Sequence, residues 1–291
     1  MTTGSDYFDL RTAPLRIGTV TLMVRDLQRA AEFYRKIIGL TQIETGADRV
    51  VLGIGSDPLV ILAGDPRLTP RDPRQAGLFH TAFLLPRRAD LGRWLAHAAR
   101  SGIKLEGASD HIVSEALYLS DPEGNGIEVY ADRPASSWQA PAGKLRMATD
   151  PLDLQDLLRS AGTTRWEGFP RHGAIGHVHL QLGDTEVGDR FYRDILGFDI
   201  SARYPGASFY GSGGYHHQLA GNVWNSRGAG RRPEGMAGLA EIRIIARDGG
   251  RVSEIVGRAE AAEIAMHRDG ETPILSDPWG TSLALTAADR A

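Results

Sequence analysis

The sequence contains no cysteine, so it can form no disulfide bond. Any tightly bound metal ion would need histidine, aspartate or glutamate as ligands. No run of about 18 apolar residues occurs, and residues 1–16 lack the apolar core of a signal peptide. These absences predict a cytoplasmic protein without a membrane partner.

Charge of one sign is also scarce. The formal net charge is −3 over 291 residues, and no run of like charges occurs. Because nothing in this pattern attracts nucleic acid, we expect a small molecule as the partner instead. Hydrophobic residues make up 42% of the chain and charged residues 24%, which is typical of a globular protein. The length is typical of two domains.

An internal repeat organises the chain. Residues 17–40 align without a gap with residues 175–198. Each copy begins with alternating apolar and polar residues, which predicts a half-buried strand. A helix follows, with Asp26 or Asp184 as its N-cap, a Phe-Tyr pair within it and a glycine at its end.

A second type of segment follows each copy of the repeat. Residues 77–133 read as a strand, a helix and two strands joined by an Asp-Pro-Glu-Gly turn, and residues 236–288 follow the same plan. The chain therefore contains four βαβββ modules, which we number one to four in sequence order. We predict an α+β fold.

The four modules predict two domains, at residues 1–133 and 174–291. Residues 134–173 lie between them, are rich in proline and glycine, and carry a short helical pattern at residues 152–158. This segment is predicted to be a linker with a short helix.

Two histidines and one glutamate have the character of metal ligands. His177 begins the first strand of module three, His80 begins module two, and Glu128 lies on the last strand of module two. Two histidines and a carboxylate can hold a divalent metal ion and leave three coordination positions open, and both Fe(II) and Mn(II) accept this set. Taken singly, each residue is more often an ordinary polar residue of a strand.

The matching positions of modules one and four hold no ligand set. They carry Thr19, Glu241 and Ala284. A complete set therefore requires modules two and three together. We predict that modules two and three close around a metal site, and that modules one and four close around a degenerate one.

Other reactive side chains fall in the same two modules. His216 and His217 lie on what reads as a late strand of module three, and His217 can act as a general acid or base because the pKa of histidine is near neutrality. His111 and Tyr118 of module two can hydrogen-bond to a substrate, although Tyr118 can equally be a packed core residue. His179 is expected to be structural.

These residues resemble the vicinal oxygen chelate superfamily, which includes glyoxalase I, bleomycin-binding proteins and extradiol ring-cleaving dioxygenases. The resemblance covers about residues 17–285 and implies two vicinal-oxygen-chelate domains with curved mixed β-sheets. The likeness is closer to two-domain bacterial catechol 2,3-dioxygenase-like proteins. It rests on four segments: Gly77–His80, Ser109–Tyr118, Asp121–Tyr130 and Gly213–His217.

The resemblance implies a metal centre. The ligands would be His80, Glu128 and His177, and the metal would be Fe(II), with Mn(II) as the second choice. Better-known extradiol enzymes take all three ligands from the last two modules, whereas here the complete set lies in the middle two.

The resemblance also implies a reaction, the cleavage of a catechol-type aromatic ring by O2. His217 would be the acid–base catalyst. Tyr118 and His111 would lie beside the substrate.

Two other functions stay open. One is a glyoxalase-like isomerase or thiol transferase that uses Ni, Zn or Mn, and the other is a metal-free module that binds an aromatic drug. A binding module has no need of a ligand set with His217 beside it, and an isomerase has no evident need of His217 together with Tyr118. A homo-oligomer is compatible with the sequence. The basic loop at residues 227–232 reads as a solvated loop or as a lid.

Overall fold

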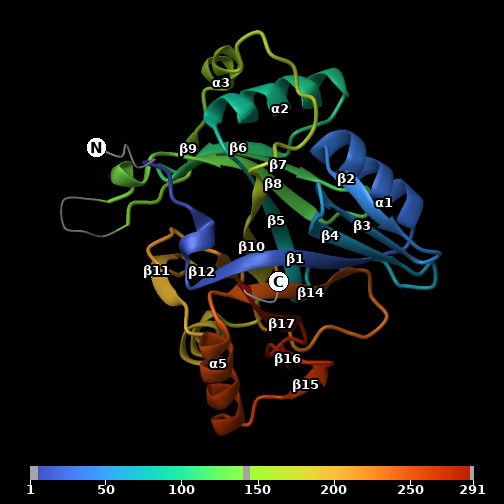
Figure 1. Ribbon diagram of the computed structural model, residues 1–291, viewed down its shortest axis with the longest axis vertical. Coiled ribbons are helices and arrows are strands. Elements are labelled where there is room, and N and C mark those ends of the chain that lie inside the picture. Colours follow the sequence, from blue (N-terminus) through green and yellow to red (C-terminus); the bar gives the residue numbers. More distant parts are fainter. Residues whose placement is uncertain (1–5, 140–144, 289–291) are drawn as a thin grey trace.

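The computed structural model describes residues 6–139 and 145–288, which form two curled, mixed β-sheets with few helices (Figure 1). The predicted α+β class is confirmed. The ends of the predicted domains at residues 1–5 and 289–291, and residues 140–144 of the predicted linker, lie outside the described residues. The division into domains at residues 133 and 174 stays a prediction, because each sheet combines strands from both halves of the chain.

The first sheet combines modules one and four, in the strand order β15-β16-β17-β14-β1-β4-β3-β2. Its central strands, β1 and β14, are antiparallel, and each is parallel to the last strand of its own module. The strands are β1 (Leu15–Val24), β2 (Thr41–Thr45), β3 (Arg49–Ile54), β4 (Asp57–Gly64), β14 (Gly238–Ala246), β15 (Met266–Asp269), β16 (Thr272–Ser276) and β17 (Ser282–Ala287).

The second sheet combines modules two and three, in the order β11-β12-β13-β10-β5-β8-β7-β6-β9. This confirms the pairing of modules that the distribution of candidate ligands predicted. Apart from the added β9, its order repeats that of the first sheet. The strands are β5 (Gly77–Leu85), β6 (Gly107–Asp110), β7 (Ser114–Ser120), β8 (Gly126–Asp132), β9 (Asp150–Pro151), β10 (Ala174–Gln181), β11 (Asp199–Tyr204), β12 (Ala207–Gly211) and β13 (Leu219–Asn222).

The helices of modules one and three have the predicted ends. The carboxylates of Asp26 and Asp184 accept hydrogen bonds from backbone N–H groups of the first helical turn. Gly39 and Gly197 follow the helix ends with φ values of 87° and 81°, a left-handed conformation that glycine adopts without strain. The sequence did not reveal that each helix widens into a π-helical turn: α1 (Leu27–Phe33) continues as η2 (Tyr34–Ile38), and α4 (Thr185–Asp189) continues as η4 (Arg190–Ile195).

The tyrosine of each Phe-Tyr pair joins one module to the next. Tyr34 of module one donates a hydrogen bond to Asp121 in the turn of module two, at 3.2 Å. Tyr192 of module three makes the same bond to Asp277 of module four, at 2.8 Å. All four side chains are buried. The repeated tyrosine and the repeated turn are therefore parts of one structural contact.

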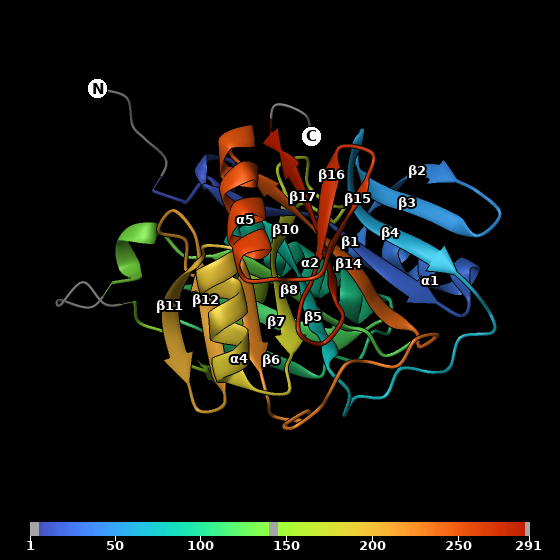
Figure 2. The same cartoon turned by 90° about the horizontal axis from the view of Figure 1, so that it is seen from below.

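The longer helices lie over the outer faces of the sheets. Figure 1 shows α2 and α3 stacked over β6, β7 and β8, and Figure 2 shows α4 near one end of α5. Alternate strand residues such as Phe83 and Val129 point into the apolar core on this side. The opposite face of the second sheet is left for other contacts. The remaining helices are η1 (Leu10–Thr12), α2 (Arg88–Arg100), η3 (Ala135–Ser137), α3 (Leu154–Ser160) and α5 (Gly249–Ala261).

The linker does more than connect the halves. Its strand β9 pairs with β6 and so extends the second sheet, and Trp138 is buried beside Tyr215. The predicted helix is present as α3. In the described part of the chain, no helix is both long enough and apolar enough to span a membrane.

Candidate metal centre

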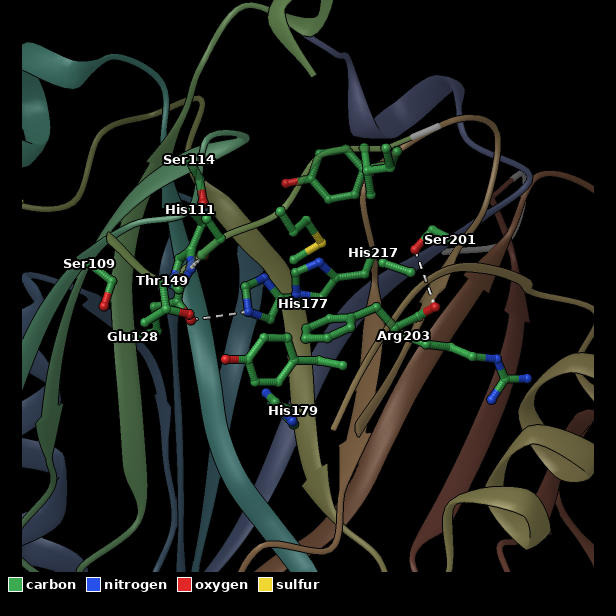
Figure 3. Close-up of a pocket in the computed structure, with 18 of the residues that line it drawn as sticks. Ser109, His111, Ser114, Glu128, Thr149, His177, His179, Ser201, Arg203 and His217 are labelled. Atoms are coloured by element: carbon green, nitrogen blue, oxygen red, sulfur yellow. Dashed lines mark hydrogen bonds and ion pairs between the residues drawn. The ribbon is translucent and has the colours of Figure 1, made fainter. Parts of the chain in front are cut away.

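The three candidate ligands come together because their strands are neighbours in register. His177 of β10 pairs with Ala82 of β5, and Ala82 pairs with Glu128 of β8. Residues that pair across strands point to the same face, and so does His80, two positions before Ala82. The small side chain of Ala82 leaves space above it. Two ligands from its neighbours and one from its own strand meet in that space. Figure 3 shows the side chains of Glu128 and His177 pointing toward each other.

The ligand atoms form a compact triangle. The Nε2 atom of His80 lies 3.0 Å from Oε2 of Glu128, and Nε2 of His177 lies 3.2 Å from the same oxygen. The two Nε2 atoms are 3.4 Å apart. All three side chains are buried. Within the described residues, they form the single group of three or more histidine or acidic residues whose geometry could hold a metal ion.

This triangle fits a divalent ion. Ligand atoms on one face of an octahedron, with bonds of about 2.1 Å, lie about 3.0 Å apart because adjacent bonds meet at a right angle. The observed separations are close to that value. Imidazole and carboxylate ligands also suit Fe(II) and Mn(II).

The protonation states favour metal binding. Burial lowers the pKa of His177 to about 4, so its imidazole is neutral near pH 7. Burial alone would raise the pKa of the Glu128 carboxyl, but the neighbouring His177 and His80 hold it well below its usual range. Neutral imidazoles and an ionised carboxylate are the forms that bind metals.

Tyr118 and His111 lie beside the triangle and bond to each other. Tyr118 of β7 pairs with Glu128, which places its side chain on the same face. Its hydroxyl lies 2.6 Å from Nε2 of His111, and Nδ1 of His111 lies 2.6 Å from the carbonyl of Ala148. Since a carbonyl only accepts, Nδ1–H is the donor to Ala148, and Nε2, when it carries no proton, accepts from Tyr118. Burial, with the charge of Glu128, raises the pKa of Tyr118 well above its usual value.

His217 also faces the centre, but from a bend and not from a strand as predicted. The bend lies between β12 and β13. The rings of His217 and His177 are 4.1 Å apart between centroids, and Phe209 packs on His217 at 5.0 Å. Burial, together with the charge that His177 can carry, keeps the pKa of His217 well below its usual value. His217 is therefore a neutral imidazole near pH 7.

His179 is held by a neighbour, as a structural histidine would be. It pairs with His80 across β10 and β5, and its Nε2 accepts a hydrogen bond from the Asn222 amide at 3.0 Å. Its ring lies 4.9 Å from that of His80 and also lines the pocket. His179 therefore packs directly beside one candidate ligand.

A pocket of about 840 Å³ opens over the triangle. One wall is formed by the linker through Leu145, Met147 and Thr149, and the facing wall by β11 and β12. The basic loop at residues 227–232 does not line this pocket, so the lid that it could have formed is absent from this conformation.

One residue of the surroundings escaped the sequence reasoning. Asp132 at the end of β8 is buried and in contact with His216, which is also buried. The pair of adjacent histidines was the available signal. The acidic partner could not be identified because it lies 84 positions earlier in the chain.

The chain resembles proteins of known activity. The catechol-2,3-dioxygenase of Bacillus subtilis (strain 168) is 42% identical over 234 residues, which are 79% of this chain and 82% of that protein. Biphenyl-2,3-diol 1,2-dioxygenase 2 of Rhodococcus globerulus is 34% identical over 114 residues, which are 36% of this chain and 60% of that protein.

A solved structure and a family model also match this chain. The structure of glyoxalase I from Zea mays superposes with a TM-score of 0.57 at 17% identity, covering 94% of this chain and 93% of that one. The model of the Glyoxalase/Bleomycin resistance protein/Dioxygenase superfamily matches residues 16–129 and 174–285. The resemblance seen in the sequence is thereby confirmed: the chain belongs to the Glyoxalase/Bleomycin resistance protein/Dioxygenase superfamily.

Proposed function

We propose that this protein is a metal-dependent extradiol dioxygenase, which opens the ring of a catechol-type aromatic with O2. The observation that carries the proposal is the triangle of His80, Glu128 and His177 on the floor of a large pocket. The relative named catechol-2,3-dioxygenase, 42% identical over most of both chains, supports it.

In this proposal the triangle holds Fe(II), with Mn(II) as the alternative. Such an ion would supply Lewis acidity toward the two diol oxygens and one-electron chemistry toward O2. Three protein ligands leave open positions for the reactants. Both oxygen atoms of O2 enter the product, and the bond that breaks lies beside the diol.

His217 accepts a proton from the diol. Its ring stands over His177 and lines the pocket, so a bound diol is within its reach. Because the imidazole is neutral near pH 7, it can take the proton as the diol binds and return it to the product later. Catalysis by a positioned base of this kind contributes about 10²–10⁴-fold to a rate.

Tyr118 and His111 orient the other side of the substrate. The high pKa of Tyr118 keeps its hydroxyl protonated; because that proton is donated to His111, the hydroxyl oxygen is left to accept a hydrogen bond from the substrate. His111 holds that hydroxyl in place and is itself held by the carbonyl of Ala148 in the linker. A substrate that bonds to Tyr118 therefore contacts a preorganised group.

The walls of the pocket bind the ring and exclude water. Phe79, Phe209 and Trp224 supply aromatic surface, and Leu145 and Met147 supply aliphatic surface. Such a surface suits an aromatic substrate, and the volume of about 840 Å³ accommodates a diol with a substituent.

Anaerobic loading tests the function. The protein is loaded with Fe(II) without oxygen, then mixed with catechol and oxygenated buffer, while O2 uptake and visible absorbance are recorded. The proposal expects O2 uptake in equal amount to catechol and a yellow ring-opened product. The chelated protein and the Zn(II)-loaded protein are the controls, and both should be inactive.

The same experiment separates the two alternatives. Bound iron with no O2 uptake on any catechol would contradict the proposal. Conversion of a thiohemiacetal without O2 would then indicate an isomerase. Stoichiometric binding of an aromatic compound without metal and without turnover would indicate a binding module.

A further inference from the structure

His216 is a buried histidine that the proposed reaction does not use directly. Its side chain is 0% exposed. The ring is enclosed by Tyr215, at 4.0 Å between centroids, and by Trp138 of the linker, at 5.0 Å. A polar ring in such a place is stabilised when its nitrogens are hydrogen-bonded.

Both nitrogens of His216 have partners. Nε2 lies 2.9 Å from Oδ1 of Asp132, and Nδ1 lies 2.9 Å from Nδ1 of His217. Asp132 also accepts from the hydroxyl of Tyr215 at 3.3 Å, which bonds in turn to the hydroxyl of Tyr130. Hydrogen bonds therefore connect Asp132, His216 and His217 in a continuous chain from the end of β8 to the pocket.

The chemistry of the partners decides which atoms donate and which accept in this hydrogen-bond chain. A carboxylate only accepts, so Nε2–H of His216 donates to Asp132. When the ring of His216 carries a single proton, at Nε2, its Nδ1 has a lone pair and accepts from Nδ1–H of His217. The second nitrogen of His217, Nε2, is left with a lone pair, and within the described residues no hydrogen bond engages it.

The ring of His217 is also fixed in orientation. It packs between His177 and Phe209, and it lines the pocket. The bend that carries it is held by Ser201, whose hydroxyl donates to the carbonyl of His216. Only the hydrogen bond from Nδ1 distinguishes the two tautomers of the ring.

We propose that Asp132 and His216 are positioning residues, which hold His217 as its Nδ1–H tautomer with the Nε2 lone pair presented to the pocket. The inference deepens the proposed function and rests on it for the role of His217 as a base. The opposite tautomer would present an N–H group to the diol and could not accept its proton. Neighbours that fix the tautomer of a functional histidine typically contribute about 10–100-fold to activity.

Two substitutions at one position test this hydrogen-bond chain. His216→Leu removes both hydrogen bonds and keeps the apolar contacts. His216→Gln is the conservative control, because its amide nitrogen can donate to Asp132 while its amide oxygen accepts from His217. Metal content and thermal unfolding show that each variant is folded, and Asp132→Asn replaces His216→Leu if that variant does not fold.

The first readout is the tautomer, which does not depend on the reaction. Nitrogen-15 NMR of the full chain, loaded with diamagnetic Zn(II), reports which ring nitrogen of His217 carries the proton. We expect Nδ1–H in the unsubstituted protein and in His216→Gln, and a mixture containing Nε2–H in His216→Leu. Nε2–H in the unsubstituted protein, or an unchanged tautomer in His216→Leu, would overturn the proposal.

The second readout is the division between kcat and KM in the Fe(II)-loaded protein. We expect His216→Leu to lower kcat about 10–100-fold with KM for catechol changed less than about threefold, and His216→Gln to recover most of the loss. An unchanged kcat in a folded, metal-loaded His216→Leu variant would contradict the positioning role. If the unsubstituted protein cleaves no catechol, the proposed function fails while the NMR result still decides the tautomer.

Discussion

The two sheets of this molecule have the same strand order, yet one carries a candidate metal centre and the other does not. At the place of Ala82 in the second sheet, the first sheet has Arg243, which pairs with Ala284 as Ala82 pairs with Glu128. Glu241 stands where His80 stands, and its carboxylate lies 3.9 Å from Arg243. The same positions of the two sheets therefore carry a weak ion pair in the first sheet and a candidate metal-ligand set in the second.

The comparison teaches that the repeat supplies the scaffold twice and the chemistry once. The links from Tyr34 to Asp121 and from Tyr192 to Asp277 are kept in both halves. The ligand positions are not kept. Substitutions at structural positions should have matching effects in the two halves, and substitutions at ligand positions should not.

The largest difference is expected at the carboxylate ligand. Glu128→Ala introduces the residue that the first sheet already has at this place. It should lower the rate of catechol cleavage at least about 10³-fold, because the metal would lose its charged ligand. Within the described residues, no other acidic side chain belongs to the ligand group. Glu241→Ala in the first sheet is the matched control and should change kcat less than about twofold. Equal losses in both variants would break the comparison.

The next effect is a pH dependence of stability that belongs to the second sheet. In the metal-free protein His177 has a pKa of about 4 when folded, against 6.5 as its ordinary value. Between these pH values the unfolded chain binds the extra proton, so the folded state is most stable above pH 6.5 and loses stability as the pH falls toward 4. One such shift corresponds to about 3 kcal/mol.

Urea unfolding at pH 4.5 and pH 7.5 measures this loss. His177→Thr, which introduces the residue found at Thr19, should remove the part that His177 contributes, whereas His179 and His217, whose pKa values burial also lowers, keep the rest. A metal-free protein that is as stable at pH 4.5 as at pH 7.5 would show that the buried histidines are not held neutral.

The repeated tyrosines should give equal effects. Tyr34→Phe and Tyr192→Phe each remove a buried hydrogen bond to an aspartate, so each should lower the free energy of unfolding by about 1–3 kcal/mol. Denaturant unfolding of both variants checks the size. A loss of stability in one variant alone would show that the contact stabilises only one half of the chain.

The smallest expected effect is at Tyr118. Tyr118→Phe removes the hydroxyl that bonds to His111 and should lower kcat about tenfold, with the metal retained. Ile274→Val, at the matching place of the first sheet, should leave kcat unchanged. Steady-state kinetics with metal analysis distinguishes this result from loss of the ion.

Much of the architecture could be predicted because strand and helix periods repeat. The alternation in the two copies of the repeat, with Asp26 and Asp184 as N-caps, indicated the elements, and the structure confirms them. The pairing of modules two and three followed from the fact that no other combination gave a complete ligand set. The topology confirms this pairing.

The rest of the site depends on contacts that a local pattern does not contain. His216 and His217 both face inward because they lie on a bend, where the alternation of a strand no longer applies. Asp132 meets His216 only through the long-range pairing of sheet strands. The wall formed by Leu145 and Met147 depends on how the linker folds back over the pocket.

The most direct test of the central claim is anomalous diffraction from crystals of the full chain loaded with Mn(II) or Fe(II). One ion per chain is expected, bound to Nε2 of His80, Nε2 of His177 and the carboxylate of Glu128. An ion bound in the first sheet near Glu241, or no ordered ion at the triangle under saturating metal, would contradict the account.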